Sequence, residues 1–129
     1  MIVNGLAQPS RILIVDDEFI FSSVLEEVLL DDHEVFTAES GTLALALVNQ
    51  GQRFNVIISD IYMPSMGGIE LYKAIKNIDP KQAERIIFVS AESSTASTQA
   101  FLKSIPNKKL VKPFKLKELR VLMNTFRAQ

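Results

Sequence analysis

The sequence predicts an α/β domain in which helices cover both faces of one parallel β-sheet. Short apolar runs alternate five times with longer segments of helical periodicity. The runs are apolar at consecutive positions, as in strands that are buried on both faces of a parallel sheet. The chain has 129 residues, which suits one domain, and no repeat or linker interrupts the alternation. We therefore expect a doubly wound (βα)5, flavodoxin-like fold with a five-stranded parallel sheet in the order 2-1-3-4-5.

The five apolar runs are the expected strands. They span residues 12–15, 35–38, 56–58, 86–89 and 110–111. The last prediction is the weakest because that run holds only two apolar residues.

The first two expected helices follow strands 1 and 2. In the first, apolar residues recur at the i, i+3, i+4 spacing of a single helix face, which predicts a buried stripe. The stripe consists of Phe21, Val24, Leu25, Val28 and Leu29. The second helix is expected to begin at Ser40 or Thr42 and to carry Leu43, Leu47 and Val48.

The remaining helices have clearer boundaries. The third should follow Gly67 and Gly68, whose backbone freedom would permit the preceding turn, and should end before the Asp79–Pro80 turn. The fourth, within 95–104, is rich in Ser and Thr, so we expect it to be short or easily displaced. The fifth should open after Pro113. Its expected buried residues are Leu116, Leu119, Leu122, Met123 and Phe126.

Composition excludes several classes of protein. The formal net charge is -1, so binding of nucleic acid through bulk positive charge is not expected. The chain has no Cys and one His, which removes disulfides, thiolate catalysis and ordinary zinc sites. No segment has the length of a membrane span, and residues 1–10 lack the features of a signal peptide. We expect a cytoplasmic protein with an N-terminal extension over residues 1–10 and one domain over 11–129.

Acidic side chains follow the two strands at which the winding of the sheet would reverse. Asp16 and Asp17 come directly after the first strand, and Asp60 comes after the third. Ligand sites in such sheets form at the carboxyl ends of the strands beside this reversal, so the three carboxylates should converge there. The fourth and fifth strands end at Ser90 and Lys112, which adds a hydroxyl and a cation to the same edge.

This group of residues favours phosphoryl chemistry. Two carboxylates about 4 Å apart repel by roughly 4 kcal/mol at an effective dielectric constant near 20, so a cation should sit among them. A site with a small number of oxygen ligands suits Mg2+, and the ammonium group of Lys112 suits contact with a phosphoryl oxygen. Asp60 stands alone at its strand end and is the best candidate for a covalent phosphoryl acceptor. The glycine-rich nucleotide-binding motifs are absent, so nucleotide binding is not expected.

Four segments in order resemble the receiver domain of two-component response regulators. They are Ile12-Leu-Ile-Val-Asp-Asp17, the segment 58–68 around Asp60, Phe88-Val-Ser90-Ala-Glu92 and Val111-Lys-Pro-Phe114, and the resemblance spans about residues 10–127. It implies that Asp60 accepts a phosphoryl group from a histidine kinase or a histidine phosphotransfer protein. It also implies that Asp17, Asp60 and the Tyr62 backbone carbonyl hold Mg2+, with Asp16 acting mostly through water. Lys112 and Ser90 would contact the phosphoryl group, and the bond before Pro113 would be cis.

Two positions depart from the pattern of the family. Lys109 stands where the family commonly has a switch aromatic, and Ser90 replaces the usual Thr while keeping its hydroxyl. The resemblance therefore covers the whole phosphorylation site, whereas Ser90 lacks the aromatic side chain to which the family's switch couples it. Tyr62 and Glu92 flank the site and are expected to adjust water access, and hence the lifetime of the phosphoryl group.

Three hypotheses of function follow. The first is a phosphorylated signalling module that is not an enzyme and acts on a downstream protein or a second copy through the fourth helix, fifth strand and fifth helix. The second is an Mg2+-dependent phosphohydrolase, which is disfavoured because Tyr62 stands where a second acid-base carboxylate would be needed. The third is a receiver-like adaptor that binds partners without phosphorylation, and Lys109 makes it plausible. No nucleic-acid or membrane partner is expected for this domain.

Overall fold

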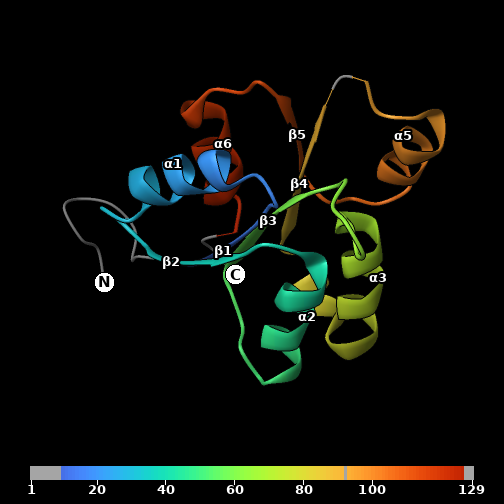
Figure 1. Cartoon of the computed structure of the whole chain (residues 1–129), viewed down its shortest axis with the longest axis horizontal. Coiled ribbons are helices and arrows are strands. Elements are labelled where there is room, and N and C mark those ends of the chain that lie inside the picture. Colours follow the sequence, from blue (N-terminus) through green and yellow to red (C-terminus); the bar gives the residue numbers. More distant parts are fainter. Residues whose placement is uncertain (1–9, 92, 127–129) are drawn as a thin grey trace.

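The computed structural model describes residues 10–91 and 93–126 and contains one sheet with helices on both of its faces (Figure 1). The strands are β1 (Arg11–Val15), β2 (Glu34–Ala38), β3 (Val56–Asp60), β4 (Ile86–Ala91) and β5 (Lys109–Lys112). All four neighbouring pairs are parallel, and their order is β2-β1-β3-β4-β5. The predicted fold class and strand order are confirmed. The expected extension over residues 1–10 lies almost wholly outside the described residues.

Alternate side chains of the strands point into two separate cores. Leu13, Ile57 and Phe88 belong to one apolar cluster, and the neighbouring residues Ile14 and Ile58 belong to the other. All are at most 1% exposed, which explains why the strands read as unbroken apolar runs.

Helices α1 (Phe19–Leu29) and α6 (Leu116–Asn124) cover one face of the sheet (Figure 1). Leu25 and Leu29 of α1 pack with Leu119 and Met123 of α6 in the core on that side. The predicted stripe of α1 is wider than the face that the helix buries, because Val24 is 58% exposed.

The opposite face carries α2 (Gly41–Asn49), α3 (Gly68–Ile78) and α5 (Ala96–Lys103), as Figure 1 shows. Of the apolar residues expected on α2, Val48 lies in the core together with Ala44, whereas Leu43 is exposed. The apolar cluster on this side also includes Leu71 and Ile75 of α3. The Ser- and Thr-rich helix predicted within 95–104 is α5, with eight residues.

A short helix that the sequence analysis missed, α4 (Pro80–Ala83), follows α3 directly. Asp79 ends α3 and also caps α4, since its carboxylate accepts hydrogen bonds from the backbone N–H groups of Lys81 and Gln82. Pro80 occupies the first turn of α4, where a missing N–H is tolerated. Within the described ranges, no helix has the length and apolar character needed to cross a bilayer.

Candidate functional site

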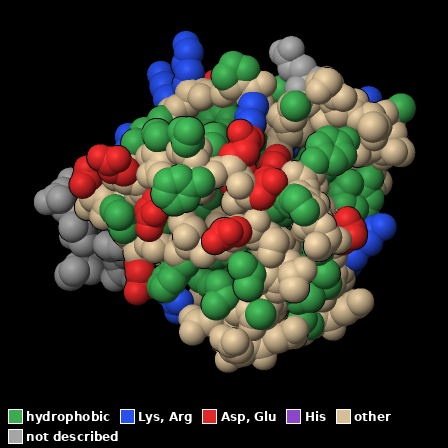
Figure 2. Space-filling model, in the orientation of Figure 1, with side chains coloured by type: hydrophobic (Ala, Val, Ile, Leu, Met, Phe, Trp, Pro, Cys, Tyr) green, Lys and Arg blue, Asp and Glu red, His purple; other side chains and the backbone are tan. Residues whose placement is uncertain are grey.

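Three carboxylates meet at the carboxyl edge of the sheet between β1 and β3. These strands are neighbours, with Val15 in register with Ser59, so Asp16 and Asp60 are carried to the same edge. Asp16, Asp17 and Asp60 each offer a carboxylate oxygen, and these atoms all lie within 4.8 Å of one another. Asp16 is buried, Asp60 is partly buried and Asp17 is exposed. The predicted convergence of the three acids is present in the structure, and Figure 2 shows acidic side chains gathered near the middle of this face.

Burial at this edge raises the pKa of two of the acids, Asp16 and Asp60. Burial, followed by the negative charge of Asp16, raises the pKa of Asp60 from 3.8 to about 6. Burial also raises the pKa of Asp16, although the backbone N–H of Glu18 and the charge of Lys112 oppose the shift. The site therefore holds more negative charge than its own residues neutralise.

Lys112 partly compensates this charge from the end of β5. Its Nζ lies 3.4 Å from Oδ2 of Asp16 and 3.1 Å from Oε1 of Glu18, and it also lies 4.1 Å from the ring centroid of Phe21. Burial lowers the pKa of Lys112, but the hydrogen bond to Glu18 and the charges of Asp16 and Asp60 outweigh it, and the pKa is raised. Lys112 thus stays cationic and has two acidic partners.

Ser90 lies in β4, between the strands that carry Asp60 and Lys112. Asp60 is in register with Val89, and Ser90 is in register with Val111 of β5. Ser90 is 3% exposed. The bond between Lys112 and Pro113 is cis, as the resemblance implied.

The sequence model of the response regulator receiver domain family matches residues 12–124 of this chain. The chain belongs to the response regulator receiver domain family. The receiver domain is a regulatory signalling module.

Individual relatives agree with this assignment. The chain is 32% identical over 106 residues to a chemotaxis protein CheY homolog of Campylobacter jejuni, covering 81% of this chain and 82% of that one. It is 45% identical over 78 residues to a response regulator receiver protein of Anaeromyxobacter sp., covering 60% of this chain but only 32% of that protein. The structure of Vibrio cholerae chemotaxis protein CheY4 superposes with a TM-score of 0.75 at 31% identity, covering 92% of this chain and 98% of that chain.

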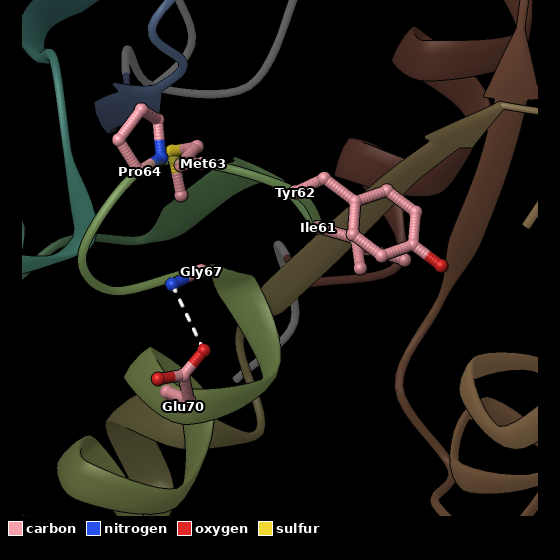
Figure 3. Close-up of a pocket in the computed structure, with 6 residues that line it drawn as sticks. All are labelled: Ile61, Tyr62, Met63, Pro64, Gly67 and Glu70. Carbon is pink, nitrogen blue, oxygen red and sulfur yellow. Dashed lines mark hydrogen bonds between the residues drawn. The ribbon is translucent and has the colours of Figure 1, made fainter. Parts of the chain in front are cut away.

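The loop after β3 of the receiver domain shows why glycines occupy positions 67 and 68. Neither has a positive φ, which corrects the expected role of their backbone freedom. The reason is close approach, since a Cβ at Gly68 would lie 2.4 Å from the backbone oxygen of Asp60. The residue of this loop that takes a positive φ is Ser65, at 70°. Figure 3 shows Glu70 reaching back to the backbone N–H of Gly67, a hydrogen bond of 3.2 Å.

A second contact fixes this loop against α2. The N–H of Gly41 donates to the backbone oxygen of Met66 at 3.2 Å. A Cβ at Gly41 would lie 2.5 Å from that same oxygen, so the two backbones approach as closely as glycine allows.

Tyr62 reaches from this loop to the start of α5 rather than along the loop. Its ring points away from Met63 and Pro64 (Figure 3). Its hydroxyl donates to Oγ1 of Thr98 at 2.8 Å and accepts from the backbone N–H of Thr95 at 3.2 Å. Hydrogen bonding with the Thr95 side chain, followed by that with the Thr98 side chain and the Thr95 backbone, lowers the pKa of Tyr62 to about 8.

Lys109, which the sequence analysis expects at the position of the family's switch aromatic, has a local partner. Its Nζ donates to the backbone oxygen of Ile105 at 3.1 Å, which ties it to the loop before β5. Burial, followed by the charge of Lys108, lowers the pKa of Lys109. Glu92, expected to tune the site, lies outside the described residues.

Sequence reasoning missed three residues around the site. Glu18 shares Lys112 with Asp16, and its only signal was a third acid directly after the Asp16–Asp17 pair. Thr95 and Thr98 hold Tyr62, and their spacing of three residues at a helix start was the available signal.

Proposed function

We propose that Asp60 accepts a phosphoryl group in a two-component phosphorelay. The observation that carries the proposal is the meeting of three carboxylates at one edge of the sheet, with oxygens within 4.8 Å of one another and the pKa of Asp60 raised to about 6. Crowded carboxylates repel one another unless a cation binds among them, and a perturbed pKa in such a cluster is typical of a functional site. The family assignment supports the same role.

The residues fit Mg2+. The carboxylates of Asp16, Asp17 and Asp60 and the backbone carbonyl of Tyr62 would hold it, with Asp16 acting mostly through water. Oxygen donors in small number suit this ion, which keeps several waters of its own. When bound, Mg2+ supplies positive charge that offsets the charge of the phosphoryl oxygens in the transfer.

The transfer itself assigns one role to each side chain. A carboxylate oxygen of Asp60 forms a bond to phosphorus while the bond from phosphorus to the donor's imidazole nitrogen breaks, and the released electron pair stays on that nitrogen. Lys112 would exchange a contact with Asp16 or Glu18 for one with a phosphoryl oxygen. Ser90 would donate its hydroxyl to another phosphoryl oxygen after a small movement of β4.

The donor would be a sensor histidine kinase or a histidine phosphotransfer protein, and the switched surface would include α5, β5 and α6. These elements would bind a downstream protein or a second copy of the chain. The domain needs no nucleic acid or membrane for this role, and the chemistry stays confined to its own phosphorylation and dephosphorylation. The expected cytoplasmic location stays a prediction.

The decisive experiment incubates the protein with Mg2+ and acetyl phosphate and measures the intact mass. We expect a gain of one phosphoryl group that hydroxylamine removes and that is absent from Asp60→Asn and from the reaction with EDTA. Steady turnover of many phosphomonoesters would instead favour a hydrolase. Absence of the adduct while partner binding is intact would favour a phosphorylation-independent adaptor. Lys109 at the expected switch position is the feature that favours this role.

The lifetime of the adduct tests the residues that flank Asp60. Tyr62 and Glu92 would adjust the access of water to the phosphoryl group. Replacing each by Ala and timing the loss of the adduct should give altered rates, and unchanged rates in both variants would refute this tuning role.

A further inference from the structure

Tyr62 belongs to two parts of the molecule at once. Its backbone lies two residues after Asp60, and its carbonyl is the one proposed above as a ligand of Mg2+. Its side chain extends to the N-terminus of α5, so the ring spans from the acidic site to a different helix. A shift of the backbone at this residue therefore acts directly on α5.

The contact with α5 is a small network of hydroxyls. Besides the bonds to Thr98 Oγ1 and Thr95 N–H, the Tyr62 hydroxyl lies 3.5 Å from Oγ1 of Thr95. Thr95 is the N-cap of α5, since its Oγ1 accepts from the N–H of Thr98 at 3.2 Å, and its hydroxyl donates to Oγ1 of Thr98 at 3.0 Å. Thr98 is 6% exposed, whereas Tyr62 is 48% exposed. Tyr62 thus reinforces the cap from outside the helix.

The other end of α5 is held differently. Leu102 is buried in the core, and the ring of Phe101 packs edge-on against the ring of Tyr72 at 5.9 Å. The N-terminal half has few apolar residues and is rich in Ser and Thr, so its position depends on polar contacts. This division makes the N-terminal half the part of α5 that can respond to a change at Tyr62.

We propose that the Tyr62 hydroxyl is a latch that couples the phosphorylated site to the position of α5 in this chain. The latch provides a route to α5 that requires no aromatic side chain at position 109, where Lys109 is bound to the loop before β5. The proposal rests on the phosphoacceptor function proposed above. A phosphoryl group that moves the Tyr62 backbone would change the stability of the latch. Because such coupling is reciprocal, loss of the latch would change the response of α5 to the phosphoryl group.

The test uses hydrogen exchange, read by mass spectrometry, of the whole chain without ligand and with Mg2+ and beryllium fluoride, a stable mimic of the phosphoryl group. Tyr62→Phe keeps the ring and removes the hydroxyl. We expect amides in the first turn of α5 to exchange about fivefold faster without ligand, as for the loss of one hydrogen bond. We also expect the change that beryllium fluoride causes at α5 in the wild type to be largely lost.

Two further variants sharpen the test. Thr98→Val removes the acceptor hydroxyl with little change in shape and should reproduce both effects. Tyr72→Phe removes the hydroxyl of the chain's other tyrosine, which packs near the opposite half of α5, and should leave the first turn of α5 as in the wild type.

The outcomes separate this inference from the proposed function. If the wild type gains neither a phosphoryl group nor beryllium fluoride, the phosphoacceptor function is wrong. If the wild type is modified and Tyr62→Phe and Thr98→Val keep the wild-type exchange of α5 with and without ligand, the latch is overturned and the phosphoacceptor function stands.

Discussion

Replacing Asp60 by Asn should stabilise the protein in the absence of divalent ions. The pKa of Asp60 rises from 3.8 to about 6 on folding because the carboxyl is partly buried beside Asp16. The folded state therefore binds this proton more tightly than the unfolded chain. Above pH 6 the ionised carboxylate opposes folding, and below about pH 4 the penalty is gone.

The size of the effect follows from this shift. Each pKa unit corresponds to about 1.4 kcal/mol, so a shift of about two units sets an upper bound near 3 kcal/mol. Asp60 is partly exposed, and solvent screening reduces the expected gain for Asp60→Asn to about 1–2 kcal/mol in the free energy of unfolding at about pH 8. The gap between the two proteins should close toward pH 4.

Urea unfolding followed by circular dichroism, with EDTA present, measures this difference. Asp31→Asn is the matched control, because Asp31 is an exposed acid in the turn after α1 and the change in net charge is the same. Added Mg2+ should stabilise the wild type more than Asp60→Asn. Equal or lower stability of Asp60→Asn at pH 8 would refute the reasoning that the buried, ionised carboxylate of Asp60 opposes folding.

Three other substitutions test the surroundings of the site. Gly68→Ala should lose about 1–3 kcal/mol in urea unfolding, because the new Cβ meets the Asp60 backbone oxygen, and should slow phosphorylation; wild-type behaviour in both assays would contradict this contact. Lys112→Met should abolish most of the acetyl phosphate adduct in the mass assay while the fold survives by circular dichroism, and an undiminished adduct would exclude Lys112 from the transfer. Gln82→Ala should lose about 2–4 kcal/mol, because its buried amide bonds both backbone polar groups of Phe54; a loss below about 1 kcal/mol would show that water replaces it.

The sheet and the acidic edge could be predicted because they depend on patterns that are local in sequence. Each strand is a run of buried apolar residues, and the topology of such folds carries Asp16, Asp17 and Asp60 to one edge. The cis bond before Pro113 followed from the resemblance.

Other features depend on tertiary contacts that no local pattern encodes. Asp79 was interpreted as the end of one helix because its second role, as the cap of α4, requires the chain to restart a helix at once. The burial of Val24 was predicted from periodicity, but the width of a buried face depends on the neighbouring helix. The partner of Tyr62 lies 36 residues away in sequence, so its hydrogen bond to Thr98 could not be inferred.

The segment between Asp60 and α3 is restrained unequally on its two flanks. On the side of α2, the N–H of Gly41 donates a hydrogen bond to the carbonyl of Met66, and a side chain at position 41 would collide with that oxygen. On the side of α5, the segment is held through the hydroxyl of Tyr62, a side chain that is 48% exposed. A displacement of the backbone at Asp60 is therefore opposed more strongly on the side of α2 than on the side of α5. The segment should move preferentially toward α5, even before a partner binds.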